Sequence, residues 1–289
     1  MRKISSFLAI ALFASTLFSC SSATDNQSDK DAAPKERIVS LNGAVTEIIS
    51  DLGHEKELVG RDVTSTYPQW VKDSVKDLGH VRSISVEAIL ALNPTLILAS
   101  DKDLPPAIDE KLKNSGIKFK VFHQDFSVEG TKQLIGEVAQ FIGDDKAQNL
   151  QTKVDSELTA VKTFSTKPKV LFIYARGAGT MMVAGSNTPM ENIISLAGGT
   201  NAATGFTDFK PLTPEALVNS NPDVILLFDS GLQSLGGVDG LLKVQGVAQT
   251  NAGKNKAVIT MDGGLLADFG PRLGEAAVTL NSLLAKYAH

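Results

Sequence analysis

The sequence predicts an α/β protein of two lobes, each a parallel sheet covered by helices, joined by one long rigid helix with a ligand cleft between the lobes. Three observations predict this fold: a weak internal repeat, continuous apolar strands that follow helices, and a long helical segment near the middle of the chain. Strands that read as continuous apolar runs are typical of parallel sheets buried on both faces, whereas half-solvated strands alternate.

The internal repeat consists of a short helix, an Asn-Pro pair and an apolar strand. Residues 86–100 (VEAILALNPTLILAS) match residues 214–228 (PEALVNSNPDVILLF) at one glutamate, alanine, asparagine, proline, isoleucine and leucine. Ser85 and Thr213 precede the two helices as expected N-caps, and each helix ends at the Asn-Pro pair because proline cannot continue it. The copies lie too far apart in the chain for a solenoid, so they indicate two lobes.

Other segments complete a β-α-β alternation in each lobe. The apolar strand at the start of each lobe leads through a small-residue turn into a helix. The expected strands lie over 37–41, 95–99, 118–122, 169–174, 224–228 and 257–261, and the expected helices over 45–52 and 190–196.

The connection between the lobes is predicted to be a single helix. Residues 144–166 carry apolar side chains at helical spacing and contain no glycine or proline, which predicts one helix of about 20 residues. The expected boundaries are 36–143 for the N-terminal lobe, 144–167 for the connecting helix and 168–289 for the C-terminal lobe.

The N-terminus is typical of a lipoprotein signal peptide over residues 1–19, followed by a flexible tether over 20–35. Arg2 and Lys3 precede an apolar run that is too short to span a bilayer and ends just before Cys20, the single cysteine of the chain. An internal disulfide is thereby excluded, and lipidation of Cys20 predicts an extracytoplasmic protein anchored to a membrane. The alternative is an ordinary signal peptide that is cut nearby and leaves a free cysteine.

Charge and motifs exclude several classes of function. The chain has 28 Lys and Arg against 32 Asp and Glu, a net charge of −4, which argues against general nucleic-acid binding. It contains no G-x-S-x-G elbow and no P-loop lysine, and its four histidines give neither a hydrolase set nor a convincing zinc site. A non-enzymatic function is therefore expected.

Four segments carry a resemblance to a known family: 37–49 (RIVSLNGAVTEII), 78–100 (LGHVRSISVEAILALNPTLILAS), 175–185 (ARGAGTMMVAG) and 209–217 (FKPLTPEAL). From Arg37 onward the chain resembles the periplasmic-type binding proteins of ABC importers for iron complexes, cobalamin and haem, most closely the haem-binding members. The resemblance implies a monomeric carrier that captures haem in the cleft and delivers it to a permease dimer with its ATPase. A ferric siderophore or cobalamin on the same scaffold, or an interaction lipoprotein without transport, remains open.

The resemblance also implies ligand contacts. Haem-binding relatives commonly carry a tyrosine iron ligand where this chain has His80, and imidazole also binds iron, so His80 is the first candidate and Tyr67 the second. Arg82 and Arg176 are candidates for the haem propionates, because the guanidinium fork suits a carboxylate. The alternative for either arginine is an ion pair within the protein.

Further residues are candidates for lining the ligand pocket or for binding the permease. Tyr174, Met181 and Phe206 are candidate pocket residues, although Met181 equally fits a core position. Relatives dock on basic permease residues through a glutamate near each repeated helix, and the matching residues here are Glu87 and Glu215. The alternative is that these acids only stabilise the positive ends of their helices.

Overall fold

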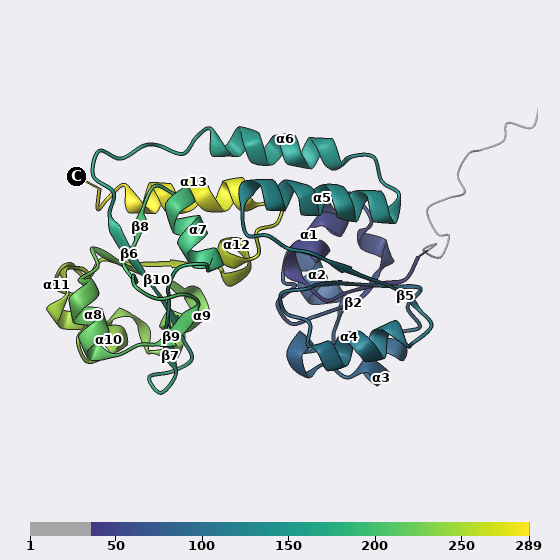
Figure 1. Ribbon diagram of the computed structural model, residues 1–289, viewed down its shortest axis with the longest axis horizontal. Coiled ribbons are helices and arrows are strands. Elements are labelled where there is room, and N and C mark those ends of the chain that lie inside the picture. The colour runs from purple at the N-terminus through teal and green to yellow at the C-terminus, as the bar shows by residue number, and fades with distance from the viewer. Residues whose placement is uncertain (1–35, 289) are drawn as a thin grey trace, which may run out of the picture. The chain divides into compact units, whose positions relative to one another are not determined.

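The computed structural model describes residues 36–288 (Figure 1). These residues form two sheets, and all strand pairs of the first sheet are parallel. Its strand order is β3-β2-β1-β4-β5. Buried side chains of α1 and α5 pack on one face, and those of α3 and α4 on the other. The elements of this N-terminal half are β1 (Ile38–Ser40), α1 (Gly43–Asp51), β2 (Leu58–Arg61), α2 (Gln69–Ser74), β3 (Lys76–Asp77), α3 (Val86–Leu90), β4 (Leu96–Ser100), α4 (Pro106–Lys113), β5 (Lys118–Phe122) and α5 (Val128–Ile142).

The second sheet is mixed, which differs from the expectation of two parallel sheets. Its order is β11-β10-β6-β7-β9, with β8 beside β6, and both pairings of β7 are antiparallel. A tight turn after β6 sends the chain straight back as a hairpin, so no crossover helix intervenes. The elements are β6 (Lys169–Ala175), β7 (Met181–Ala184), α7 (Pro189–Leu196), β8 (Thr200–Asn201), β9 (Phe209–Pro211), α8 (Pro214–Ser220), β10 (Val224–Phe228), α9 (Asp229–Ser234), α10 (Gly237–Leu242), α11 (Asn251–Asn255), β11 (Val258–Met261), α12 (Gly263–Ala267) and α13 (Leu273–Leu284).

The predicted repeat is confirmed in detail. The Ser85 hydroxyl accepts a hydrogen bond from the Ala88 amide, and the Thr213 hydroxyl accepts one from the Ala216 amide. The asparagine of each Asn-Pro pair has a left-handed backbone, with φ of 48° and 36°. The following strands, β4 and β10, pair with β1 and β6, the first strands of their sheets. Local sequence therefore builds the same unit twice.

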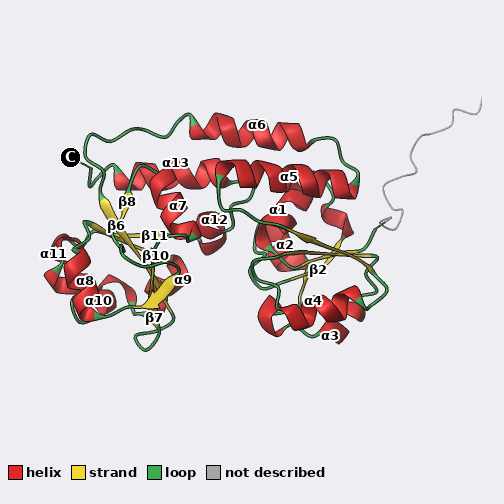
Figure 2. Ribbon diagram, viewed as in Figure 1, coloured by secondary structure: helices red, strands yellow, loops and turns green. Residues whose placement is uncertain are grey.

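The connecting helix is shorter than the predicted 144–166. Helix α6 covers Ala147–Leu158, and the chain then runs as a loop to β6 (Figure 2). At the C-terminal end of α6, the backbone hydrogen bonds join residues three apart instead of four. Beyond this turn, the Asn281 side chain of α13 forms hydrogen bonds with both the amide and the carbonyl of Lys162. This tertiary contact replaces the helical partners of Lys162, which is why helical spacing alone overestimated the length.

Three helices join the two halves. Helix α6 packs along α5 and α13, and one continuous apolar core includes residues of all three together with α1 and α7 (Figure 1). Within residues 36–288, no helix combines the length and the hydrophobicity that crossing a bilayer demands.

Candidate functional site

A cavity of about 710 Å³ lies between the two halves, beyond the carboxyl ends of strands from both sheets. Ligands of open α/β sheets bind at this end of the strands, and pockets of about 300–1,000 Å³ hold small molecules. The cavity is lined from the N-terminal half by Thr64, Thr66 and His80, and from the C-terminal half by Tyr174, Ala175, Arg176, Phe228, Ser230, Ser234, Asp262, Gly263, Gly264, Ala267 and Asp268. The structure thus brings together three predicted site residues: His80, Tyr174 and Arg176.

Tyr174 and Arg176 form a pair at the end of β6. The Arg176 Nε donates a hydrogen bond to the Tyr174 phenol oxygen, and the guanidinium carbon lies 5.7 Å from the centre of the tyrosine ring. The turn after β6 is closed by a 2.9 Å bond from the Arg176 amide to the Thr180 carbonyl, and Gly177 supplies its left-handed φ of 70°. This hydrogen bond and the ring contact fix the orientation of the Tyr174 side chain at the cavity wall.

His80 lies on the opposite wall and is exposed. It precedes a short 3₁₀ helix (Val81–Ser83), and its Nδ1 accepts a 3.3 Å hydrogen bond from the Arg82 amide. A neutral ring in this arrangement carries its proton on Nε2. Binding of iron through Nε2 therefore requires the proton to move to Nδ1 and the bond to Arg82 to open.

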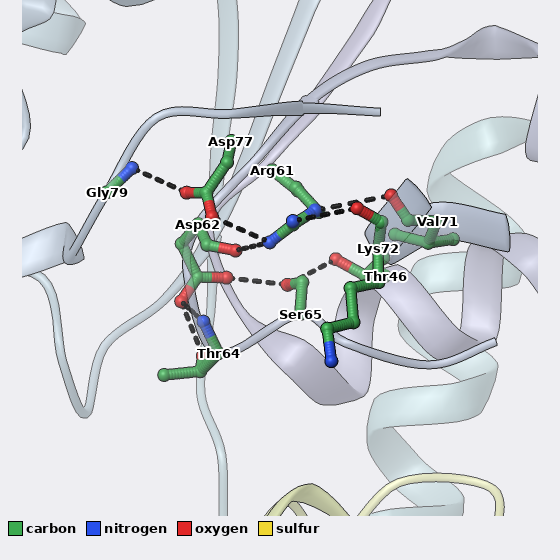
Figure 3. A network of polar contacts seen from close by, with 9 residues as sticks. All are labelled: Thr46, Arg61, Asp62, Thr64, Ser65, Val71, Lys72, Asp77 and Gly79. Atoms are coloured by element: carbon green, nitrogen blue, oxygen red, sulfur yellow. Dashed lines mark hydrogen bonds and ion pairs between the residues drawn. The ribbon is translucent and has the colours of Figure 1, made fainter. Parts of the chain in front are cut away.

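A polar network holds the N-terminal wall in place (Figure 3). The Asp62 carboxylate accepts hydrogen bonds from the Thr64 amide at 3.0 Å and from the Ser65 hydroxyl at 2.5 Å. Arg61 pairs with Asp77 at 3.3 Å, and Asp77 in turn accepts a 2.8 Å bond from the amide of Gly79, next to His80. The two loops that line the cavity from this side thus share one network.

The structure places the other predicted contacts elsewhere. Arg82 pairs with Asp103 at 3.1 Å and lines a neighbouring polar cavity of about 560 Å³. Phe206 lines a separate apolar cavity of about 260 Å³ under α8, and Met181 is half-buried on β7. Tyr67 is 41% exposed and stacks on an arginine. Met181, Phe206 and Tyr67 are not among the residues that line either cavity between the halves.

Three further residues at this junction, Glu47, Asp268 and Arg272, were not predicted from the sequence. Glu47 of α1 accepts hydrogen bonds from Arg272, and Asp268 lines both cavities between the halves. A Cβ atom on Gly43 would lie 2.2 Å from the Asp268 carboxylate, so only glycine allows this approach. One sequence signal was available, because a glutamate inside an otherwise apolar helix has to find a partner when it is buried.

Burial shifts the pKa of both acids at the junction upward. Burial raises the pKa of Glu47 from 4.5 to about 7, because the loss of hydration outweighs the attraction of Arg272. Burial, together with the nearby charges of Glu47 and Asp62, raises the pKa of Asp268 well above its usual 3.8. The folded protein therefore retains protons that the unfolded chain releases.

We expect the free energy of unfolding to fall as the pH rises from 5 to 8. The stabilisation from these two acids is complete below their unfolded pKa values and is lost as the pH passes through the folded ones. Urea unfolding at several pH values measures this slope, and Asp268→Asn should reduce it. An equal slope in the variant would mean that Asp268 does not titrate in this range.

The two candidate docking acids are exposed in the first turns of α3 and α8. The Ser85 hydroxyl donates a 2.7 Å hydrogen bond to Glu87, and this bond, with one from the backbone amide of Glu87, lowers the pKa of Glu87. Glu215 occupies the matching place in the second repeat. Each half thus presents one carboxylate on equivalent helices.

Comparison with known proteins gives relatives that are similar in sequence. YvrC of Bacillus subtilis (strain 168), named an uncharacterised ABC transporter substrate-binding lipoprotein, is 31% identical over 269 residues, which cover 89% of this chain and 83% of YvrC. The vitamin B12-binding protein of Vibrio campbellii is 28% identical over 196 residues, 66% of this chain and 70% of its own.

Two solved structures are also similar. The periplasmic haem-binding protein RhuT of Roseiflexus sp. RS-1, in apo form, superimposes with a TM-score of 0.85 at 39% identity over 88% of this chain and 99% of RhuT. The periplasmic haem-binding protein BhuT, in complex with two haems, gives a TM-score of 0.82 at 34% identity, with 87% and 98% of the two chains covered. The model of the periplasmic binding protein family matches residues 38–265, which include both sheets and all but two of the residues that line the cavity, so the chain belongs to that family.

Proposed function

We propose that this protein captures haem between its two lobes, residues 36–143 and 168–289, and delivers it as a monomer to the permease and ATPase of an ABC importer. One observation carries the proposal: His80, Tyr174 and Arg176, from facing elements, line a single cavity of about 710 Å³. Histidine and tyrosine are iron ligands in haem proteins. The similarity to RhuT and BhuT supports haem as the ligand.

Tyr174 and His80 are the proposed iron ligands, on opposite walls of the cavity. Arg176 supports the phenol oxygen, and Phe228, whose ring packs edge-on against Tyr174 with centres 6.3 Å apart, gives an apolar surface for the porphyrin. Arg82 is the weaker candidate for a propionate, because it pairs with Asp103 and lines the neighbouring cavity. The protein acts in this proposal as a carrier and performs no chemistry on the haem.

Titration of the purified protein with haemin tests the proposal. We expect a Soret band that saturates with protein-bound haem. Cobalamin is the second candidate, because relatives at 27–29% identity are named vitamin B12-binding or cobalamin-binding proteins. Calorimetry with cobalamin and with a ferric siderophore separates the alternatives. Tight binding of either one without a saturating haem spectrum would overturn the haem assignment.

We also propose that Cys20, which lies outside the described residues, carries a lipid anchor. The support is the apolar run before it and the lipoprotein name of YvrC. Labelled fatty acid should enter the wild-type protein when it is made in a bacterial host, and Cys20→Ser should abolish the label. Retention of the label by Cys20→Ser would place the modification elsewhere.

A further inference from the structure

A buried, hydrogen-bonded pair, Glu47 and Arg272, joins the two halves. The Arg272 amide and its Nε and Nη2 atoms bond to the Glu47 carboxylate at 3.0, 2.9 and 2.9 Å. Glu47 lies in α1 of the N-terminal half, whereas Arg272 precedes α13 of the C-terminal half. Both residues are buried, at 2% and 8% exposure. Buried pairs of this geometry are disrupted at high cost, so the joint is stiff.

The same guanidinium also contacts a loop that forms the N-terminal wall of the cavity. Its central carbon lies 3.6 Å from the centre of the Tyr67 ring, the geometry of a stacked cation–π contact. Tyr67 directly follows Thr66, a lining residue of the cavity. Asp268, four residues before Arg272, lines the cavity from the other half. Arg272 is thus held close to both walls at once.

We propose that Glu47, Arg272 and Tyr67 form a clamp, here called the Arg272 clamp, that sets the width of the cleft and thereby the retention of the ligand. Tyr67 acts in it as a positioning residue through its ring and not as an iron ligand through its hydroxyl. The part of this inference that concerns haem rests on the proposed function. The part that concerns the distance between the two halves does not.

The loop that carries Tyr67 has a contact with its own half and one with the opposite half. The Tyr67 ring therefore has a role of its own, although the Glu47–Arg272 hydrogen bonds are the stronger contact between the halves. The Ser65 hydroxyl lies 2.8 Å from that of Thr46 in α1, which ties the start of the loop to its own half. The Tyr67 ring extends the loop to Arg272, which the C-terminal half contributes. Loss of the ring leaves the Glu47–Arg272 bonds in place but frees the loop from the opposite half.

Three substitutions at Tyr67 separate the possible roles. Tyr67→Phe keeps the ring and removes the hydroxyl, Tyr67→Leu keeps the apolar bulk, and Tyr67→Ala removes both. We expect Tyr67→Phe to release haem to excess apomyoglobin at the wild-type rate, within about twofold, and Tyr67→Leu and Tyr67→Ala about tenfold faster. All three should keep the wild-type Soret maximum. A shifted maximum in Tyr67→Phe would show that the hydroxyl binds iron, and wild-type release from Tyr67→Ala would overturn the clamp.

A second measurement needs no haem. In a full-length Cys20→Ser chain, spin labels on Lys111→Cys and Lys243→Cys, both exposed and in opposite halves, report the distance between the halves. We expect one narrow distance distribution for the parent and for Tyr67→Phe, and a broader one for Tyr67→Ala. Equal distributions for all three would overturn the clamp. Failure of the parent to bind haem, with the broadening still present, would overturn the proposed ligand and leave the clamp intact.

Discussion

Tyr174→Phe should lower haem affinity by about 100-fold and His80→Ala by at least tenfold, with Tyr174→Phe also shifting the Soret maximum. The phenol oxygen already accepts the Arg176 hydrogen bond in the orientation that faces the cavity, whereas His80 has to change tautomer before Nε2 binds iron. Arg176→Ala should cost about tenfold, the range typical of residues that support a metal ligand. Haemin titration and competition with apomyoglobin give the affinities.

The controls for this experiment come from the chain itself. Tyr174→Phe keeps the ring that packs against Phe228, so its far-ultraviolet spectrum should be unchanged. Tyr287→Phe makes the same chemical change at a residue packed against the core, away from the cavity, and should leave haem binding intact. Wild-type spectra and affinities for both Tyr174→Phe and His80→Ala would contradict the proposed ligand set.

The double variant Glu87→Lys/Glu215→Lys should abolish haem uptake by cells while the purified protein still loads haem normally. Both acids are exposed in the first turns of the repeated helices, and neither lines the cavity. The hydrogen bond from Ser85 lowers the pKa of Glu87, which favours the charged form of that carboxylate. The resemblance implies that these acids dock on basic permease residues. Two lysines at these places would repel those residues, so the loss should exceed that of either single Ala variant.

A matched control reverses one acid in each half outside the repeated helices. Glu110 of α4 and Asp239 of α10 are equally exposed, so Glu110→Lys/Asp239→Lys changes the net charge by the same amount. We expect near-normal uptake from this control. Normal uptake by Glu87→Lys/Glu215→Lys would leave the two glutamates with only a helix-terminus role.

Elements whose signals are local could be predicted from the amino-acid sequence. The apolar runs predicted β10 at its observed residues and β4 within one residue, and Ser85 and Thr213 cap α3 and α8 as expected. The asparagine of each Asn-Pro pair has a left-handed backbone, but only Asn221 is the C-cap of its helix, whereas α3 ends earlier, with Ala91 as its C-cap. These features depend on a few neighbouring residues, whose backbone preferences act wherever the segment lies.

The end of α6 and the composition of the site depend on contacts between segments that are far apart in the chain. Asn281 forms hydrogen bonds with Lys162, 119 residues away in the sequence, and Arg272 forms hydrogen bonds with Glu47, 225 residues away. Arg82, expected at the same ligand as Arg176, is paired with Asp103 in the neighbouring cavity. Whether a charged side chain meets a ligand, a partner or water depends on contacts between distant segments, and no periodicity in the sequence encodes those contacts.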